Sequence, residues 1–137
     1  MYIPVHFQAW ELVPIDIYEL MGDQSFILLS TQLLITIDQI RNFFNSRMTI
    51  NDYRNGGDHH FRGFRHALCL IGGKESQHRF GNAADGIIEG VPADKARKAI
   101  IANAEDFPYL TRMEEGVPWL HIDCKSMDEP GIHLFKA

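Results

Sequence analysis

The chain has 137 residues, of which 45% are hydrophobic and 23% are charged, and its net charge is −5 at pH 7. This composition is typical of an ordinary globular protein, and the length predicts a single domain over residues 1–137. The acidic balance excludes the basic face that nucleic-acid binding requires, so we expect no nucleic acid among the partners.

The first third of the chain is expected to be mostly helical. Residues 1–12 have no clear period and are interpreted as an N-terminal arm packed against the body. Pro14 begins a short helix that Gly22 ends, since proline is favoured in a first turn. Ser30 and Thr31 are N-cap candidates for a helix over 31–45, whose apolar residues fall at helical spacing: Leu33, Leu34, Ile37, Ile40, Phe43 and Phe44.

Strands are expected to dominate the rest of the chain. Residues 48–53 predict a strand, the glycine-rich stretch 54–65 a surface loop, and 67–71 a short buried strand. Further strands are predicted over 83–88, 109–113, 118–123 and 132–135, with a helix over 92–104 between the first two of these. The sum is an α+β fold in which a small antiparallel sheet packs against helices.

Two stretches carry residues suited to metal chemistry. His78 and Asp85 lie seven residues apart with Gly81 between them, and His121 and Asp123 alternate on one face of a predicted strand. Two histidines and a carboxylate are a common ligand set for catalytic zinc, with the fourth position left to water. The sequence therefore predicts a zinc site at one end of the sheet.

These stretches resemble the signatures of a known peptidase family. Residues 76–85 fit the pattern S-x-H-x-x-G-x-A-x-D, and Trp119-Leu120-His121-Ile122-Asp123 follows downstream. Both patterns are similar to those of zinc D-Ala-D-Ala carboxypeptidases and L-Ala-D-Glu endolysins, which cut peptidoglycan peptides. Ile50 to Tyr53, Gly63-Phe64-Arg65 and Gly72-Gly73 also look like the family's approach to the first motif, so the resemblance covers roughly residues 31–125.

The resemblance implies a role for each matching residue. His78, Asp85 and His121 would hold one Zn²⁺ per chain, and Asp123 could orient His121. An arginine of the preceding loop would hold the substrate carboxylate or the developing oxyanion. Arg65 is the first choice for that arginine, and Arg54 is the second. Ser76 is expected to hydrogen-bond the substrate or a ligand, and Trp119 to form a wall of the cleft.

One position departs from the family pattern. Many members carry an acidic general base three residues before the last histidine, and here that position is Pro118. Proline can neither accept nor donate a proton, so the base must come from elsewhere. The candidates are Glu114, Glu115 and Asp123, of which Glu115 is slightly preferred.

The function implied by the resemblance is zinc-dependent cleavage of peptidoglycan stem peptides that contain D-amino acids. The departure at Pro118 keeps open an inactive zinc-binding relative that serves as a wall-binding or virion structural module. The first residues have no basic region followed by a long apolar run, so we expect no signal peptide and no membrane span. A monomer made in the cytoplasm and released to the wall by a phage lysis system fits these expectations.

Other reactive residues receive simpler interpretations. Cys69 and Cys124 are expected to be free thiols, although a pairing stays open, because Cys packs readily as a small hydrophobe. His59 and His60 near Asp58 suggest a second metal site or a nuclease motif, but the acidic charge and the absence of partner residues disfavour both.

Overall fold

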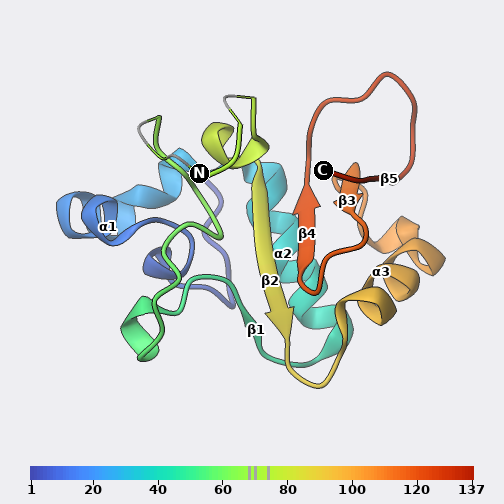
Figure 1. The fold of residues 1–137 in the computed structure, drawn as a ribbon, viewed down its shortest axis with the longest axis horizontal. Helices are drawn as coiled ribbons and strands as arrows, with labels where there is room; N and C mark the ends of the chain where they lie inside the picture. Colours follow the sequence, from blue (N-terminus) through green and yellow to red (C-terminus); the bar gives the residue numbers. More distant parts are fainter. Residues whose placement is uncertain (68, 70, 74) are drawn as a thin grey trace.

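The computed structural model describes residues 1–67, 69, 71–73 and 75–137, and its fold is α+β as the sequence predicts (Figure 1). The helices are α1 (Ile15–Met21), α2 (Thr31–Phe44) and α3 (Ala93–Ala102). The strands are β1 (Met48–Thr49), β2 (Ala83–Ile88), β3 (Arg112–Glu114), β4 (Leu120–Asp123) and β5 (His133–Phe135). Short 3₁₀ turns complete the described elements: η1 (Ala9–Glu11), η2 (Gly22–Leu28), η3 (Tyr53–Asn55), η4 (Gln77–Phe80) and η5 (Ala104–Asp106).

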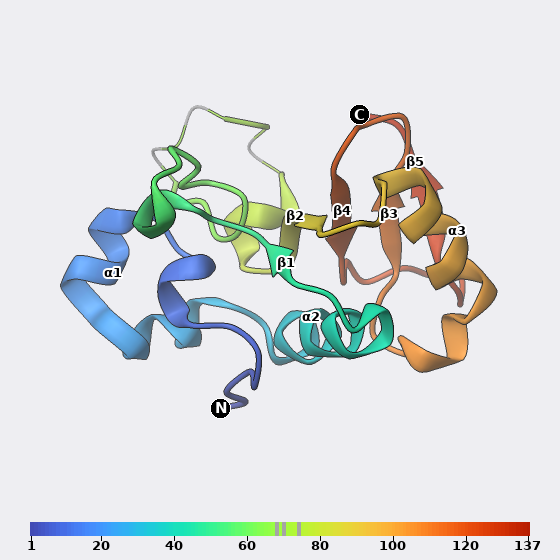
Figure 2. The same ribbon diagram turned by 90° about the horizontal axis from the view of Figure 1, so that it is seen from below.

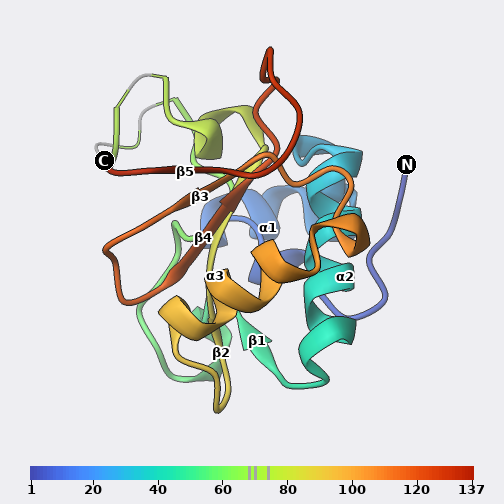
Figure 3. The ribbon, with the colours of Figure 1, turned by 90° about the vertical axis from the view of Figure 1, so that its right-hand side faces the viewer.

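The five strands form one open sheet in the order β1-β2-β4-β3-β5. All neighbours pair antiparallel except β3 and β5, which are parallel, so the sheet is mixed rather than purely antiparallel. Figure 2 shows α2 on one side of this sheet and the C-terminus on the other. Figure 3 views the molecule from the side on which α3 lies, and α3 contacts β4.

Helix α2 begins and ends where its sequence directs. The side chain of Ser30 accepts a hydrogen bond from the backbone N–H of Leu33 at 3.1 Å, which caps the N-terminus. Asn45 adopts a left-handed conformation and ends the helix. Four of the six apolar residues expected on the inner face are buried: Leu33, Leu34, Ile37 and Ile40. The other two lie nearer the surface, since Phe43 is 37% exposed and Phe44 is half-buried.

Alternation along the strands divides the sheet into two unlike faces. Ala84, Ile122 and Met113 are fully buried in the same core as α2. Their neighbours on each strand point to the opposite face, because strand side chains alternate. These neighbours are mostly polar and lie beside one another in the register: Asp85 opposite His121, His121 opposite Glu114, and Asp123 opposite Arg112.

Several predicted boundaries were wrong. The strand expected over 48–53 stops at Thr49, because Tyr53–Asn55 forms a 3₁₀ turn. The strands expected from 109 and 118 begin at Arg112 and Leu120, and the helix expected to reach 104 ends at Ala102. The strand expected over 67–71 includes Leu68 and Leu70, which lie outside the described residues.

The N-terminal residues are joined to α2 through one buried carboxylate. Asp38, 4% exposed, accepts hydrogen bonds from the hydroxyl of Tyr2 and from the backbone N–H groups of Val5 and His6. Phe7 is buried in the core beyond them. Within the described ranges, no single helix is long and apolar enough to cross a membrane, although the bent pair Ile15–Leu28 and Thr31–Phe44, at 92°, meets that test together.

Candidate metal centre

Three elements bring the predicted ligands together. Asp85 on β2 lies directly opposite His121 on β4, so their side chains share the polar face of the sheet. His78 comes from η4, which Gly81 ends with a φ of +67° before the chain enters β2. A Cβ at Gly81 would overlap the carbonyl of Leu28, so this close turn requires glycine.

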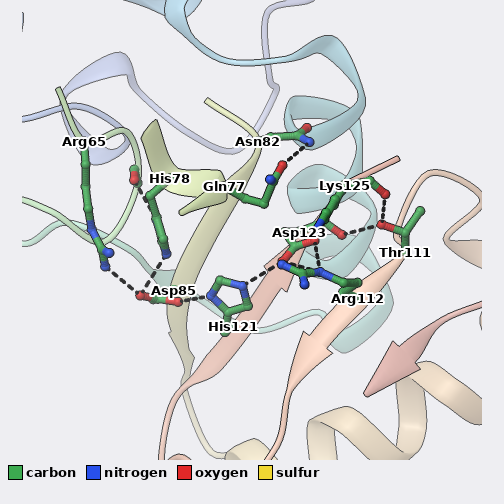
Figure 4. Close-up of polar contacts among 11 residues, drawn as sticks. Arg65, Gln77, His78, Asn82, Asp85, Thr111, Arg112, His121, Asp123 and Lys125 are labelled. Atoms are coloured by element: carbon green, nitrogen blue, oxygen red, sulfur yellow. Dashed lines mark hydrogen bonds and ion pairs between the residues drawn. The ribbon is translucent and has the colours of Figure 1, made fainter. Parts of the chain in front are cut away.

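The three side chains are buried and face one another (Figure 4). His121 Nδ1 lies 2.7 Å from Asp85 Oδ1, and His78 Nε2 lies 3.3 Å from Asp85 Oδ2. One ligand atom from each residue lies within 4.8 Å of the other two. This group could hold a metal ion, and within the residues that the structure describes no second group of this kind is found.

The remaining ring nitrogens are held by protein acceptors. His78 Nδ1 donates to the carbonyl of Gly63 at 2.8 Å, and His121 Nε2 donates to Asp123 Oδ2 at 3.0 Å. Asp123 is fully buried and also accepts from Arg112, with the shortest distance 2.8 Å. Such outer contacts fix the tautomer and orientation of metal-binding histidines, so this donor set fits a metal ion well.

The carboxylates govern the charge of the centre in the metal-free protein. Burial acts to raise the pKa of Asp85, but hydrogen bonds from His121 and His78 hold that pKa well below its usual range. Burial acts to lower the pKa of His121, but hydrogen bonds to Asp123 and Asp85 raise it to about 9. At neutral pH His121 is therefore a cation, and its Nδ1–H and Nε2–H donate to Asp85 and Asp123 respectively.

A cavity of about 340 Å³ opens over the three residues. Of the residues expected to act on substrate, Ser76, Trp119 and Arg65 line this cavity. Arg65 donates to the carbonyl of Phe61 at 2.7 Å and lies 3.4 Å from Asp85. Glu114 also lines it, as expected from its position opposite His121.

Other expected residues lie elsewhere. Glu115 is not among the residues that line the cavity, and its backbone N–H donates to Phe135. Arg54 lies over the rings of Trp10 and Tyr18, in a different surface hollow. Asp123 lies behind His121 and is not among the lining residues either.

Sequence reasoning missed Arg112 and Phe135. Arg112 pairs with Asp123, and its guanidinium lies 4.2 Å from the ring centre of Phe135, which in turn contacts the ring of His121 edge-on. Arg112 and Glu114 are two residues apart on β3, a spacing that places both on one face. The strand predicted over 109–113 stopped one residue short of Glu114, so the prediction did not place Glu114 on that face.

The remaining reactive residues do not join this centre. Cys69 and Cys124 are both free thiols, and burial raises the pKa of Cys124 to about 11. His59 lies 3.0 Å from both Asp52 and Arg62, on the loop beside the cavity.

No known family model matches the chain, and neither the curated proteins nor the solved structures yield a significant match. The likeness to wall peptidases therefore rests on the short motifs alone. What the geometry adds independently is a buried His-Asp-His group on a mixed five-stranded sheet.

Proposed function

We propose that this protein is a zinc-dependent peptidase that cleaves peptidoglycan stem peptides containing D-amino acids. The observation that carries the proposal is the buried group of His78, Asp85 and His121, in which each imidazole has one nitrogen near Asp85 and the other bonded to an oxygen acceptor. The two motifs that resemble wall peptidases support the choice of a peptide substrate.

The donor set favours zinc among the common metals. Two neutral imidazoles and one carboxylate match the three protein ligands typical of catalytic zinc sites. When bound, zinc supplies a Lewis acid that polarises a carbonyl and lowers the pKa of an attacking water. Asp123, held in its ion pair with Arg112, keeps Nε2 of His121 protonated and leaves Nδ1 for the metal.

Glu114 is the general base that this geometry favours over Glu115. Its carboxylate lies on the strand neighbouring His121, on the same face, and it lines the cavity. Glu115 follows it directly and contributes nothing to that lining. Glu114 would accept a proton from the attacking water and return it to the leaving nitrogen.

Arg65 would stabilise the oxyanion that forms on the substrate carbonyl. Its guanidinium carries five N–H donors, and among the described residues the carbonyl of Phe61 and the carboxylate of Asp85 accept from them. The remaining donors in a partly buried cavity would act strongly on developing negative charge.

The test combines metal analysis with wall hydrolysis. The purified protein is expected to contain close to one zinc per chain and to clear a suspension of purified peptidoglycan. His78→Ala should lose both properties, whereas His6→Ala, which changes an exposed histidine, should keep them. Glu114→Gln should retain zinc and lose roughly 10²- to 10⁴-fold in rate. Failure to take up zinc would overturn the metal assignment, and full activity of Glu114→Gln would overturn the base assignment.

A metal-binding protein without catalytic activity is the second candidate, serving as a wall-binding or virion structural module. Pro118 favours it, because the family's usual base position carries no carboxylate here. Pro118 is exposed and lines an apolar hollow between β2 and α3, away from the metal ligands. Stoichiometric zinc without release of any wall fragment would support this second function.

A further inference from the structure

A second cavity adjoins the candidate metal centre on the side of the loop 58–62. Its volume is about 330 Å³, close to that of the first cavity. The two cavities share four lining residues, so Asp85, one of the three candidate metal ligands, lies at their junction: Arg65, Ile71, Asp85 and Trp119. Each cavity alone is large enough for a small organic group.

The wall of this second cavity is fixed by specific hydrogen bonds. Asp52 accepts from both the backbone N–H and the Nδ1 of His59, at 2.8 and 3.0 Å. The Nε2 of His59 accepts from Arg62 at 3.0 Å, and the backbone N–H of Arg62 donates to Asn51. His60 stacks flat on Tyr53 with ring centres 4.7 Å apart. A loop without regular structure is thereby held in one shape before any ligand arrives.

The lining of this cavity combines apolar and charged residues. Phe61, Ile71 and Trp119 supply apolar surface, and Ile71 is 51% exposed. Asp58 and Arg62 also line it, together with His59 and His60. An exposed aliphatic side chain beside two aromatic rings gains free energy when an apolar group covers it.

Each arginine that lines the two cavities has at least one partner among the described residues. Arg112 is paired with Asp123, Arg62 with His59, and Arg65 with Asp85 and the carbonyl of Phe61. Arg65 lines both cavities and lies 3.4 Å from Asp85. It would therefore contact the middle of a chain that occupies both cavities, and not the end of that chain.

From these observations we infer that the second cavity is a substrate subsite for an apolar side chain, and that the substrate chain extends across the metal ligands in both directions. This inference rests on the proposed peptidase function and specifies it as cleavage of internal bonds. Phe61, Ile71 and Trp119 determine specificity on the side of the loop, and the cavity lined by Ser76 and Glu114 receives the other part of the chain.

The first experiment uses one synthetic stem peptide in two forms, free at both ends or N-acetylated and C-amidated. The zinc-loaded protein should cut both forms at the same internal bond, with kcat/KM values within about threefold, as read by mass spectrometry of the products. Cleavage of the free form alone, from its carboxyl end, would overturn the inference and leave the peptidase proposal intact.

The second experiment measures binding without catalysis. In a Glu114→Gln background, Phe61→Ala should weaken binding of the blocked peptide about tenfold by calorimetry. Phe80→Ala, an exposed phenylalanine that lines neither cavity, should leave the affinity unchanged. Unchanged affinity in Phe61→Ala would overturn the subsite. Binding that depends on Phe61, without hydrolysis of any peptide by the unmodified protein, would support the subsite and reject the peptidase proposal.

Discussion

At the scale of single residues, His121 is the most constrained group of the centre. Each of its ring nitrogens faces a carboxylate, Asp85 at 2.7 Å and Asp123 at 3.0 Å. These two contacts would have different roles in the proposed zinc site, because Asp85 would share the metal with Nδ1 whereas Asp123 would hold the proton on Nε2. The pKa of about 9 in the metal-free protein means that a metal ion must displace one proton from Nδ1.

We therefore predict that zinc affinity depends on pH. Below the His121 pKa of about 9, the apparent association constant should rise about tenfold per pH unit, because one proton competes with the metal. Competition titrations with a coloured chelator between about pH 6 and pH 8 would measure this slope. A flat profile would show that His121 is neutral in the metal-free protein.

A second prediction concerns the outer carboxylate. Asp123→Asn keeps the shape of the side chain but removes the charge that holds His121 and Arg112. Zinc affinity should fall roughly 10- to 100-fold. Equilibrium dialysis would give the affinity, with Asp128→Asn, an exposed aspartate, as the matched control.

The sequence predicted which three side chains meet, whereas the roles assigned to them and to their neighbours stay predictions. His78, Asp85 and His121 meet as expected, since strand alternation and motif spacing both depend on nearby residues. The preference for Glu115 over Glu114 depended on where β3 ends and which residue faces His121. The strand was predicted to end at Met113, which left Glu114 and Glu115 together in the turn, and only the register of the two strands separates them.

At the scale of elements, α3 secures the segment that leads into β4. Arg97 of α3 is 8% exposed and donates to the carbonyls of Trp119 and Val117 at 3.1 and 3.2 Å. It has no acidic partner within the described residues. The helix thereby holds the backbone of Trp119 just before the strand that carries His121.

We predict that Arg97→Met destabilises the protein by roughly 1–3 kcal/mol, because two carbonyl groups lose their donor. Urea unfolding would measure the loss. Lys98→Met, on the exposed side of the same helix, is the control and should change stability by less than about 0.5 kcal/mol. Equal stability of both variants would show that water replaces the guanidinium.

Elements with strong local signals were predicted best. Helix α2 has an apolar period and a capping serine, and β2 matches its predicted bounds, Ala83–Ile88. The 3₁₀ turn Gly22–Leu28 was missed because its apolar residues show no helical period. The parallel pairing of β5 with β3 was missed because it joins segments about 20 residues apart without a local signal.

At the scale of the whole molecule, the metal centre ties separate parts of the chain together. Its ligands come from η4, β2 and β4, and the carbonyl of Gly63 adds the loop before them. The α+β class was predictable from the order of periodic segments, whereas this convergence was predictable only from the motifs. That the chain forms a single domain stays a prediction.

We therefore predict that zinc stabilises the whole fold. At about 100 times its dissociation constant, bound zinc should add about 2.7 kcal/mol and raise Tm by roughly 10 °C. Differential scanning calorimetry with and without a chelator would measure this change, and His78→Ala should show no response. A similar rise in His78→Ala would mean that zinc binds elsewhere.

The alignment of Asp85, His121 and Glu114 across three strands also limits how the chain can change in length. Removing one residue from the turn between β3 and β4 shifts their pairing by one, which turns either Glu114 or His121 towards the core. Removing two residues shifts the pairing by two, which returns both side chains to the polar face of the sheet. Insertions and deletions in this turn are therefore expected to be tolerated in pairs.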